Sequence, residues 1–292
     1  MADKRLRQAI EAGETILAPG VYDMLSALMA DRLGFTALYV TGFGVSASHL
    51  GLPDAGFATY TDMVSRVSQI VAGTNTPVVA DADTGFGGLL NVRHTVRGYE
   101  AAGVSAIQIE DQEFPKKCGH TLGRRVIPIN DMVAKIGVAV EARQSEDFLI
   151  IARTDSRTSM GLDEALKRAA AYDAAGADLI FVESPETEEE LAAVSAAMKK
   201  PLVANMVQGG RTPVLPADRL KELGYSLVLH PGLGFLSAAH ALSSAYKELA
   251  AEGHISTTPL HNFKELCSIL GFDDVYAFDQ RWAEPTSREA AE

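Results

Sequence analysis

The stretch "YEAAGVSAIQIED", residues 99–111, contains the pattern that decides the fold of this chain. It reads as the end of an amphipathic helix, then Gly103, then a short apolar run that ends in two acids. A glycine directly after a helix is typical of a left-handed backbone position, where a Cβ would clash. The apolar run is nearly unbroken rather than alternating, which indicates a strand covered on both faces, as in a parallel sheet.

The same pattern recurs elsewhere along the chain. It is found in "ADRLGFTALYVTG" (30–42), "YDAAGADLIFVES" (172–184) and "LKELGYSLVLHPG" (220–232). Further apolar runs of strand length are "TILAPG" (15–20), "TPVVADADTG" (76–85), "DFLIIARTD" (147–155) and "KPLVANM" (200–206), which brings the predicted strands to eight. Helical stretches such as "GLDEALKRAAAYDAAG" (161–176) separate them. Eight strands alternating with helices predict a (β/α)₈ TIM barrel, with a doubly wound sheet as the alternative.

Length and composition fit this architecture. The chain has 292 residues, of which 47% are hydrophobic and 22% charged. A barrel of this type uses roughly 250 residues as one domain. No Pro/Ser-rich linker or break in composition is visible, so we predict a single barrel domain over residues 1–292. Within it, residues 250–292 would form a C-terminal helical extension that includes "HNFKELCSILG" (261–271).

The charge balance limits the class of partner. The net charge is −12 and the pI is about 5.1, which argues against a nucleic acid or an anionic membrane surface as partner. The start of the chain has no apolar signal region, and no run approaches the ~18 apolar residues of a membrane span. We therefore expect a cytoplasmic protein. In that reducing compartment a disulfide between Cys118 and Cys267 is not expected.

Polar side chains recur at the predicted strand ends, which form the active face of a (β/α)₈ barrel. Counting seven residues from three of the helix-ending glycines leads to Thr41, Glu110 and Glu183. The other strands end in Asp81 and Asp83, Arg153, Asn205 and His230. We therefore expect these groups at one level of the barrel.

The acids at these strand ends indicate a metal site. Asp81 and Asp83 are two residues apart on one strand, so they would point the same way. With Glu110, and with Glu183 as a further candidate, they would repel one another unless a cation lies between them. Mg²⁺ is the default ion for such oxygen ligands. The alternative is that the aspartates cap the next turn or pair with Arg153.

The glycine-rich stretch "TGFGG" (84–88) follows these aspartates. It resembles a phosphate-binding loop, but the lysine and hydroxyl residue of a Walker motif are missing. We interpret it as a flexible turn that lets the backbone pass close to a ligand.

A cysteine lies in the loop "EFPKKCGH" (113–120), which follows the fourth predicted strand and would lie over the active face. Lys116, Lys117 and a protonated His120 would lower the pKa of Cys118 and hold its thiolate near neutrality. One cysteine and one histidine do not make a zinc site. The alternative is an ordinary surface cysteine.

Several of these stretches carry a family resemblance. "KKCGH" (116–120) resembles the signature of the isocitrate lyase part of the isocitrate lyase/phosphoenolpyruvate mutase superfamily. The blocks "YVTGFGVSASHLGLPDAG" (39–56), "DADTGFGG" (81–88), "IEDQEFPKKCGH" (109–120), "ARTD" (152–155) and "NMVQGGRTP" (205–213) are similar to its successive motifs. They occur in the same order over roughly residues 10–250. The short chain is most similar to the 2-methylisocitrate lyases, 2,3-dimethylmalate lyases and carboxyphosphonoenolpyruvate mutases.

The resemblance implies an assembly, a metal and a substrate class. It implies a barrel whose last helix is exchanged between subunits, in a homotetramer built as a dimer of dimers. It implies Mg²⁺, with Mn²⁺ as an alternative, held near Asp81, Asp83 and Glu110 and partly through water. The substrate would be a small 2-hydroxy or 2-oxo carboxylate. The positions that match its binding residues are Thr41, Gly42, Phe43, Gly119, His120, Arg153, Glu183 and Asn205.

The chemistry implied is cleavage of a carbon–carbon bond in a substituted 2-hydroxy dicarboxylate of the 2,3-dimethylmalate or 2-methylisocitrate type. The products would be pyruvate or a related oxo acid and a carboxylate. Cys118 would protonate the departing carbon, supported by Lys116 and His120. Tyr39, Glu110 or Glu183 would accept the hydroxyl proton, and the sequence does not choose among them.

Two departures from the methylisocitrate lyase pattern, Phe43 and Gln208, favour a smaller substituted malate. The alternative functions are a phosphonate enzyme that forms or breaks P–C bonds and a decarboxylase or hydrolase of oxaloacetate. The non-enzymatic alternative is a barrel that serves as a binding protein.

Overall fold

The computed structural model describes residues 2–283 and contains a closed barrel of eight parallel strands. The strands are β1 (Ile16–Val21), β2 (Leu38–Val40), β3 (Val78–Asp81), β4 (Ala106–Glu110), β5 (Leu149–Thr154), β6 (Leu179–Val182), β7 (Leu202–Asn205) and β8 (Tyr225–His230). Each strand pairs with the next along the chain, and β8 pairs with β1. This confirms the predicted (β/α)₈ barrel and excludes the doubly wound sheet.

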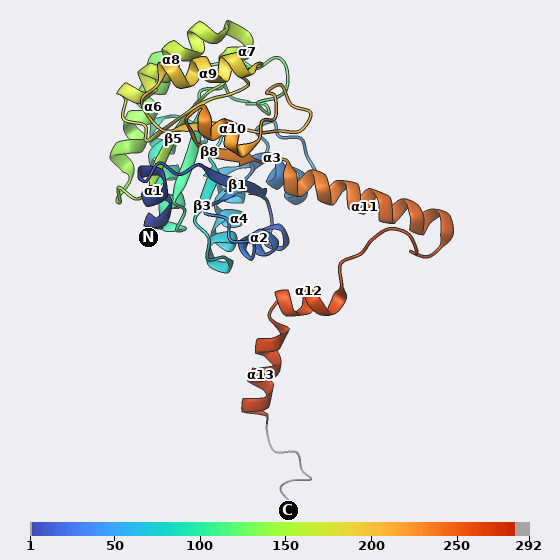
Figure 1. The fold of residues 1–292 in the computed structure, drawn as a ribbon. Coiled ribbons are helices and arrows are strands. Elements are labelled where there is room, and N and C mark those ends of the chain that lie inside the picture. Colours follow the sequence, from blue (N-terminus) through green and yellow to red (C-terminus); the bar gives the residue numbers. More distant parts are fainter. Residues whose placement is uncertain (1, 284–292) are drawn as a thin grey trace, which may run out of the picture. The chain divides into compact units, whose positions relative to one another are not determined.

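Helices connect the strands and lie around the outside of the barrel (Figure 1). They are α1 (Lys4–Glu11), α2 (Met24–Asp31), α3 (Gly42–Val45), the π-helix η1 (Ser46–Leu50), α4 (Tyr60–Gly73), α5 (Leu89–Ala101), α6 (Ile129–Ala142), α7 (Arg157–Met160), α8 (Leu162–Ala174), α9 (Glu188–Ala197) and α10 (Ala217–Glu222). The glycine of each repeated segment has a positive φ: 75° at Gly34, 87° at Gly103, 101° at Gly176 and 86° at Gly224. The glycine pattern therefore marks helix ends, as predicted.

The strand residues alternate between two apolar cores. In β3, Val78 and Ala80 pack against the surrounding helices, whereas Val79 belongs to the core inside the barrel. Leu6, Ala9 and Ile10 of α1 join that inner core. Apolar side chains thus fill the barrel interior and pack with α1, and the polar inward positions occur farther along the strands, at their C-terminal ends.

The chain divides into two compact units, Met1–Ala238 and Ala239–Glu292. The first contains the barrel and the start of α11 (Leu233–Glu252). The second contains the rest of α11, α12 (Phe263–Ile269) and α13 (Phe272–Trp282). Among residues 2–283, no helix is long and apolar enough to cross a membrane.

Candidate active site

The site is built from strand residues that point into the barrel. Side chains on a strand alternate in direction, so Asp81 lies on the same side as the inner-core residue Val79. By the same alternation Glu183 follows Phe181 inward. Arg153 lies beside Glu110 in the strand register. The predicted polar level is therefore present at the C-terminal ends of the strands.

A cavity of about 280 Å³ opens at this level. Eleven of the predicted site residues line it: Tyr39, Thr41, Phe43, Asp81, Lys116, Cys118, Gly119, His120, Arg153, Glu183 and Asn205. Three predicted residues, Gly42, Asp83 and Glu110, do not line it. Residues 84–88 are absent from the lining as well, so the expected approach of this turn to a ligand is not seen.

Arg153 lies among three buried carboxylates. Its Nε and Nη2 donate to Asp155 at 2.8 and 2.9 Å, and its guanidinium is 3.4 Å from Glu110 and 3.3 Å from Glu183. Burial alone would raise the pKa of Asp155, but the charges and hydrogen bonds of Arg153 and Arg124 lower it. Burial raises the pKa of Glu110 well above its usual range. The structural and substrate-binding interpretations of Arg153 are thus compatible, because it pairs with acids and also lines the cavity.

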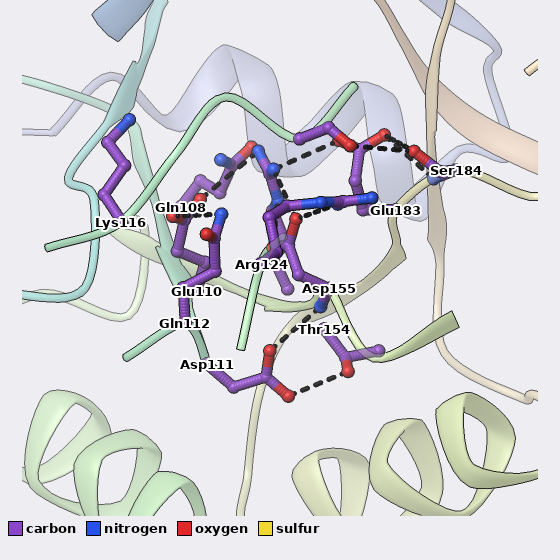
Figure 2. Close-up of polar contacts among 12 residues, drawn as sticks. Gln108, Glu110, Asp111, Gln112, Lys116, Arg124, Thr154, Asp155, Glu183 and Ser184 are labelled. Atoms are coloured by element: carbon purple, nitrogen blue, oxygen red, sulfur yellow. Dashed lines mark hydrogen bonds and ion pairs between the residues drawn. The ribbon is translucent and has the colours of Figure 1, made fainter. Parts of the chain in front are cut away.

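Glu110 also helps to place the start of the cysteine loop. Its Oε1 accepts a hydrogen bond of 2.9 Å from Gln112 Nε2, which in turn donates to the carbonyl of Lys117 at 2.7 Å. Figure 2 shows Glu110 and Gln112 side by side on the strand that leads into this loop. Glu110 therefore lies behind the cavity and connects Arg153 to the loop.

Lys116 is the second buried cation of the site, with 2% of its surface exposed. Its ammonium pairs with Asp54, and it lies 2.8 Å from Asp83 Oδ1. Burial, with the charge of Asp81 as a further contribution, raises the pKa of Asp83 to about 7 despite the charge of Lys116. Asp81 accepts a hydrogen bond of 3.0 Å from the Asp83 backbone N–H. Three aspartates thus surround a single ammonium group.

This arrangement bears on the predicted metal site. In the described part of the chain, no three His, Cys, Asp or Glu side chains come together as a ready set of metal ligands. The donors that do gather, Asp54, Asp81 and Asp83, carry more negative charge than Lys116 neutralises. A Cβ on Gly42 would lie 2.7 Å from Asp81 Oδ2, so the glycine leaves this carboxylate open. Hard oxygen donors with unbalanced charge fit a divalent cation that keeps several waters.

Cys118 lines the cavity, and its backbone N–H donates to the Asp54 carbonyl at 3.1 Å. The prediction of a lowered pKa is wrong, because burial raises the pKa of this thiol to about 11. The neighbouring cations act elsewhere: Lys116 pairs with aspartates, and Lys117 Nζ donates to the Gly123 carbonyl at 3.3 Å. Both cysteines are free, in line with the absence of a disulfide expected for them. Cys118 is therefore a protonated thiol near neutral pH.

His120 and Gly119 fit closely against the end of β6. The His120 Nδ1 accepts a hydrogen bond of 3.1 Å from the Arg211 N–H, and its Nε2 lies 3.2 Å from Asn205 Nδ2 and 3.4 Å from Glu183 Oε1. Asn205 Nδ2 donates to Glu183 at 2.9 Å, while its buried Oδ1 has no hydrogen-bond partner. A Cβ on Gly119 would lie 2.8 Å from Glu183, so only glycine fits there.

Tyr39 lies at the base of the cavity. Its hydroxyl donates to Gln108 Oε1 at 3.3 Å. Burial and the charge of Asp81 raise its pKa well above the usual range, so the phenol keeps its proton. In this state Tyr39 is a hydrogen-bond donor rather than a base.

One wall of the cavity is apolar. The ring of Phe43 stacks on that of Phe235, with centroids 4.9 Å apart and planes 8° from parallel. Val207, Pro231 and Leu236 also line the cavity. This apolar wall contrasts with the charged groups around Arg153 and Lys116.

Sequence reasoning missed several contributors. Asp54 lies in the long connection between β2 and α4, far from any strand end, and its only signal was its place in the family block 39–56. Arg124 is buried and bonds Asp155 at 2.5 Å, but in sequence it is indistinguishable from exposed Arg125. Phe235 comes from the helix after β8, which no motif marked.

Known proteins share these features. The profile of the family described as "Phosphoenolpyruvate phosphomutase" matches residues 6–250. The chain is 44% identical to the 2,3-dimethylmalate lyase of Eubacterium barkeri over 96% of this chain and 97% of that protein. It is 42% identical to the 2-methylisocitrate lyase of Aeropyrum pernix over 98% of this chain and 92% of that protein. The solved structure of an oxaloacetate acetylhydrolase with the inhibitor 3,3-difluorooxalacetate superposes with a TM-score of 0.91 at 34% identity, covering 97% of each chain.

These similarities extend over nearly the whole chain and agree with the order of motifs and the strand-end site. They confirm the predicted family, and the named lyases among the relatives support carbon–carbon lyase chemistry. The chain is a member of the phosphoenolpyruvate phosphomutase family, within the PEP mutase/isocitrate lyase superfamily.

Proposed function

We propose that this protein is a Mg²⁺-dependent carbon–carbon lyase that cleaves a substituted 2-hydroxy dicarboxylate to pyruvate or a related oxo acid and a carboxylate. The observation that carries this proposal is the protonated Cys118 thiol on the lining of a cavity that also contains Arg153 and His120. Such a site can bind carboxylates and deliver a proton. The similarity to 2,3-dimethylmalate and 2-methylisocitrate lyases supports the same reaction class.

Substrate binding would use the two polar sides of the cavity. Arg153 presents its guanidinium there while three carboxylates hold it in place, which suits it to a substrate carboxylate. The backbone N–H groups of Gly42 and Phe43, in the first turn of α3, would meet the 2-oxy acid unit, because the Thr41 N–H already donates to the Val21 carbonyl at 3.1 Å. Asn205, Gly119 and His120 would meet the second carboxyl group.

Once the hydroxyl has lost its proton, its oxygen becomes the oxo group of one product as the carbon–carbon bond breaks. The electron pair of that bond passes to the carbon of the other fragment, where it is conjugated with the carboxylate. A bound divalent cation near Asp81 and Asp83 would stabilise the oxygen of the departing oxo acid as a Lewis acid. On the other fragment, the carbon that loses its bond needs a proton. Cys118 would supply it, because its thiol is buried, protonated and on the cavity lining.

The hydroxyl proton also needs an acceptor. Of the three expected candidates, Tyr39 and Glu183 line the cavity, whereas Glu110 does not. Glu183 already accepts hydrogen bonds from Ser184 and Asn205. The Tyr39 phenol must lose its own proton before it can act as a base. We assign this role to Glu183, whose carboxylate is an acceptor on the cavity lining, and the variants Tyr39→Phe and Glu183→Gln test the choice.

The stacked pair Phe43 and Phe235 favours an alkyl group at one side of the substrate. A third carboxylate on this wall would lose hydration without gaining a cationic partner, which is costly. The wall therefore favours a methylated malate over a tricarboxylate, in agreement with the departures at Phe43 and Gln208.

A coupled assay for oxo-acid release tests the proposal. The substrates are 2,3-dimethylmalate, 2-methylisocitrate and other substituted malates, each with Mg²⁺ and with EDTA. We expect turnover on a methylated malate that EDTA abolishes and that Cys118→Ser removes while binding persists. Full turnover by Cys118→Ser would remove the thiol from the mechanism.

Oxaloacetate hydrolysis is the second candidate, because the oxaloacetate acetylhydrolase structure superposes closely. Oxalate and acetate release from oxaloacetate, measured in the same assay series, would identify it. A phosphonate reaction would appear as a changed ³¹P NMR signal from phosphonopyruvate, and we expect no such change.

We also propose that the protein is a cytoplasmic homotetramer in which the C-terminal helices are exchanged between subunits. The support is the exposure of large apolar side chains on these helices. They include Phe263, Leu270, Phe272, Val275, Tyr276, Phe278 and Trp282. Light scattering should give four subunits, and replacing Phe278 and Trp282 with serine should yield smaller species.

A further inference from the structure

The loop between β4 and α6 carries Cys118, and backbone pairing holds its two ends together. Gln112 and Val126 form an antiparallel bridge, and the Glu113 N–H donates to the Arg125 carbonyl at 2.8 Å. These contacts fix the base of the loop. The tip of the loop is positioned by further contacts.

The tip is a tight turn over residues 118–121. The Cys118 carbonyl accepts hydrogen bonds from the Thr121 N–H at 3.0 Å and from its Oγ1 at 2.7 Å. The Thr121 carbonyl in turn accepts one from Arg124 Nε at 3.2 Å. Asp54 holds the other end of the turn through the Cys118 N–H. The turn that carries the thiol is therefore held by Asp54 at Cys118, by Ser184 Oγ, which donates to the Gly119 carbonyl at 3.0 Å, and by Arg124 at Thr121.

Arg124 connects this turn to the barrel. Its Nη1 donates to Asp155 Oδ1 at 2.5 Å and its Nη2 to Thr158 Oγ1 at 2.6 Å. Figure 2 shows Arg124 and Asp155 directed toward one another beneath the loop. Asp155 Oδ1 also accepts from Arg153 Nη2 at 2.9 Å. One buried carboxylate thus contacts both the arginine of the loop and the arginine that faces the cavity.

The next residue provides a matched control. The Arg125 side chain is 76% exposed, and its guanidinium pairs with Glu113 at 2.6 Å on the surface. An exposed pair of this kind contributes little to stability. Arg124 and Arg125 therefore share residue type, loop and sequence context, and they differ in whether the side chain reaches Asp155.

We propose that Arg124 is a positioning residue that sets the place of Cys118 relative to Arg153 through their shared partner Asp155. Arg124 does not line the cavity, so it acts through other residues and not on the substrate. The consequence for catalysis rests on the proposed function, in which Cys118 is the acid. The structural consequence, which is that Arg124 restrains the loop, does not depend on the proposed function.

The geometry separates this role from a general effect on stability. If Arg124 is removed, Asp155 keeps both hydrogen bonds from Arg153, so the buried carboxylate is not left unpaired. The barrel and the cavity arginine should persist. What is lost is the connection from Asp155 to the Thr121 carbonyl, and hence the restraint on the Thr121 side of the turn that carries Cys118.

Thiol reactivity measures this restraint without any need for turnover. Cys118 and Cys267 are the only cysteines, so Cys267→Ala leaves Cys118 as the single thiol. In that background, iodoacetamide labelling at fixed pH reports how often the loop exposes Cys118. Because local opening governs access, we expect Arg124→Met to be labelled about tenfold faster and Arg125→Met to stay within about twofold of the parent.

Kinetics give a second readout. Since small displacements of a catalytic group cost roughly 10²-fold, kcat of Arg124→Met should fall by about that factor while KM changes less than about threefold. Arg124→Lys keeps one donor and should be intermediate. Added guanidinium should restore part of the activity of Arg124→Ala and none of the activity of Cys118→Ala.

The proposal is overturned if folded Arg124→Met and Arg125→Met are labelled at the same rate. If Arg124→Met does not fold, Thr158→Val removes one contact of Arg124 and should speed labelling about threefold, because the restraint is weakened rather than lost. Unchanged labelling in that variant also overturns it. A failure of the proposed lyase activity would show in the substrate assay alone and would leave the labelling result standing.

Discussion

Two buried cations, Lys116 and Arg153, contribute to the same cavity, and their surroundings differ. Lys116 has Asp54 and Asp83 as partners, with Asp81 close behind, and burial raises the pKa of Asp83 to about 7. Arg153 has Glu110, Asp155 and Glu183 as partners, and Arg124 supplies a second positive charge to Asp155. Here the pKa of Asp155 is lowered in spite of its burial.

The difference follows from the shapes of the two cations. A guanidinium offers five N–H donors in a rigid fork, so it can satisfy several carboxylates at once. An ammonium is a compact point charge and leaves the carboxylates around it underneutralised. The acids around Arg153 therefore act as scaffold, whereas those around Lys116 remain available to a further cation.

The largest expected effect concerns the thiol that lies over both cations. Cys118→Ala should lower kcat by about 10³-fold, in the range for loss of a general acid, while KM for the substrate stays near its parent value. Cys267→Ala is the control and should be fully active. Equal activity of the two variants would mean that Cys118 takes no part in the reaction. In that case neither cation cluster would support a reaction at this thiol.

The second prediction compares the clusters by stability. Asp155→Asn removes the carboxylate that pairs with buried Arg124 and one of the three carboxylates around Arg153, so it should lower the free energy of unfolding by about 3–5 kcal/mol. Asp83→Asn should cost far less, because the high pKa of Asp83 shows that its charge is poorly stabilised there. Urea unfolding in EDTA measures both. Equal destabilisation of the two variants would contradict the proposed difference between the Arg153 and Lys116 clusters.

The third prediction concerns the metal. Asp83→Asn should raise the Mg²⁺ concentration needed for half-maximal activity by about tenfold, as expected for a group that orients metal ligands or waters. Mg²⁺ should also raise the melting temperature of the parent in EDTA-treated samples, and less so in this variant. Glu141→Gln, on the outer surface of α6, serves as the control and should match the parent.

The smallest expected effect is a displaced titration. Burial raises the pKa of Cys118 to about 11, so in the Cys267→Ala background its alkylation rate should keep rising above pH 9. The sign follows from the neutral thiol being favoured in the folded protein, which delays formation of the reactive thiolate. A midpoint of the alkylation titration near or below 8.5 would instead support the prediction from the sequence that the loop cations stabilise the thiolate.

The barrel was predictable because its signals are local. The glycine after each helix and the unbroken apolar runs reflect backbone conformation and burial on both faces, which neighbouring residues determine. Strand alternation then predicts which end residues point inward, and it placed Asp81, Arg153 and Glu183 correctly on the cavity. The exchange of C-terminal helices between subunits is not a local property and stays a prediction.

The electrostatics of the site were less predictable. Lys116, Lys117 and His120 are neighbours of Cys118 in sequence, but their side chains contact Asp83, Gly123 and Glu183 instead. Desolvation of the thiol therefore decides its pKa, and proximity in sequence misled the prediction. Asp54 and Arg124 escaped notice for the same reason, since their roles depend on partners far away in the chain.

The sequence by itself determined the (β/α)₈ barrel, the family and the strand ends that supply the site, because periodicity, helix-ending glycines and ordered motifs are encoded in short segments. Only the tertiary structure decided which acid pairs with which cation, how deeply Cys118 is buried and that Arg124 and Arg153 share Asp155. These properties are sums over charges and atoms brought together from several strands and loops. Coulombic and desolvation energies depend on such distances in space and not on separation along the chain.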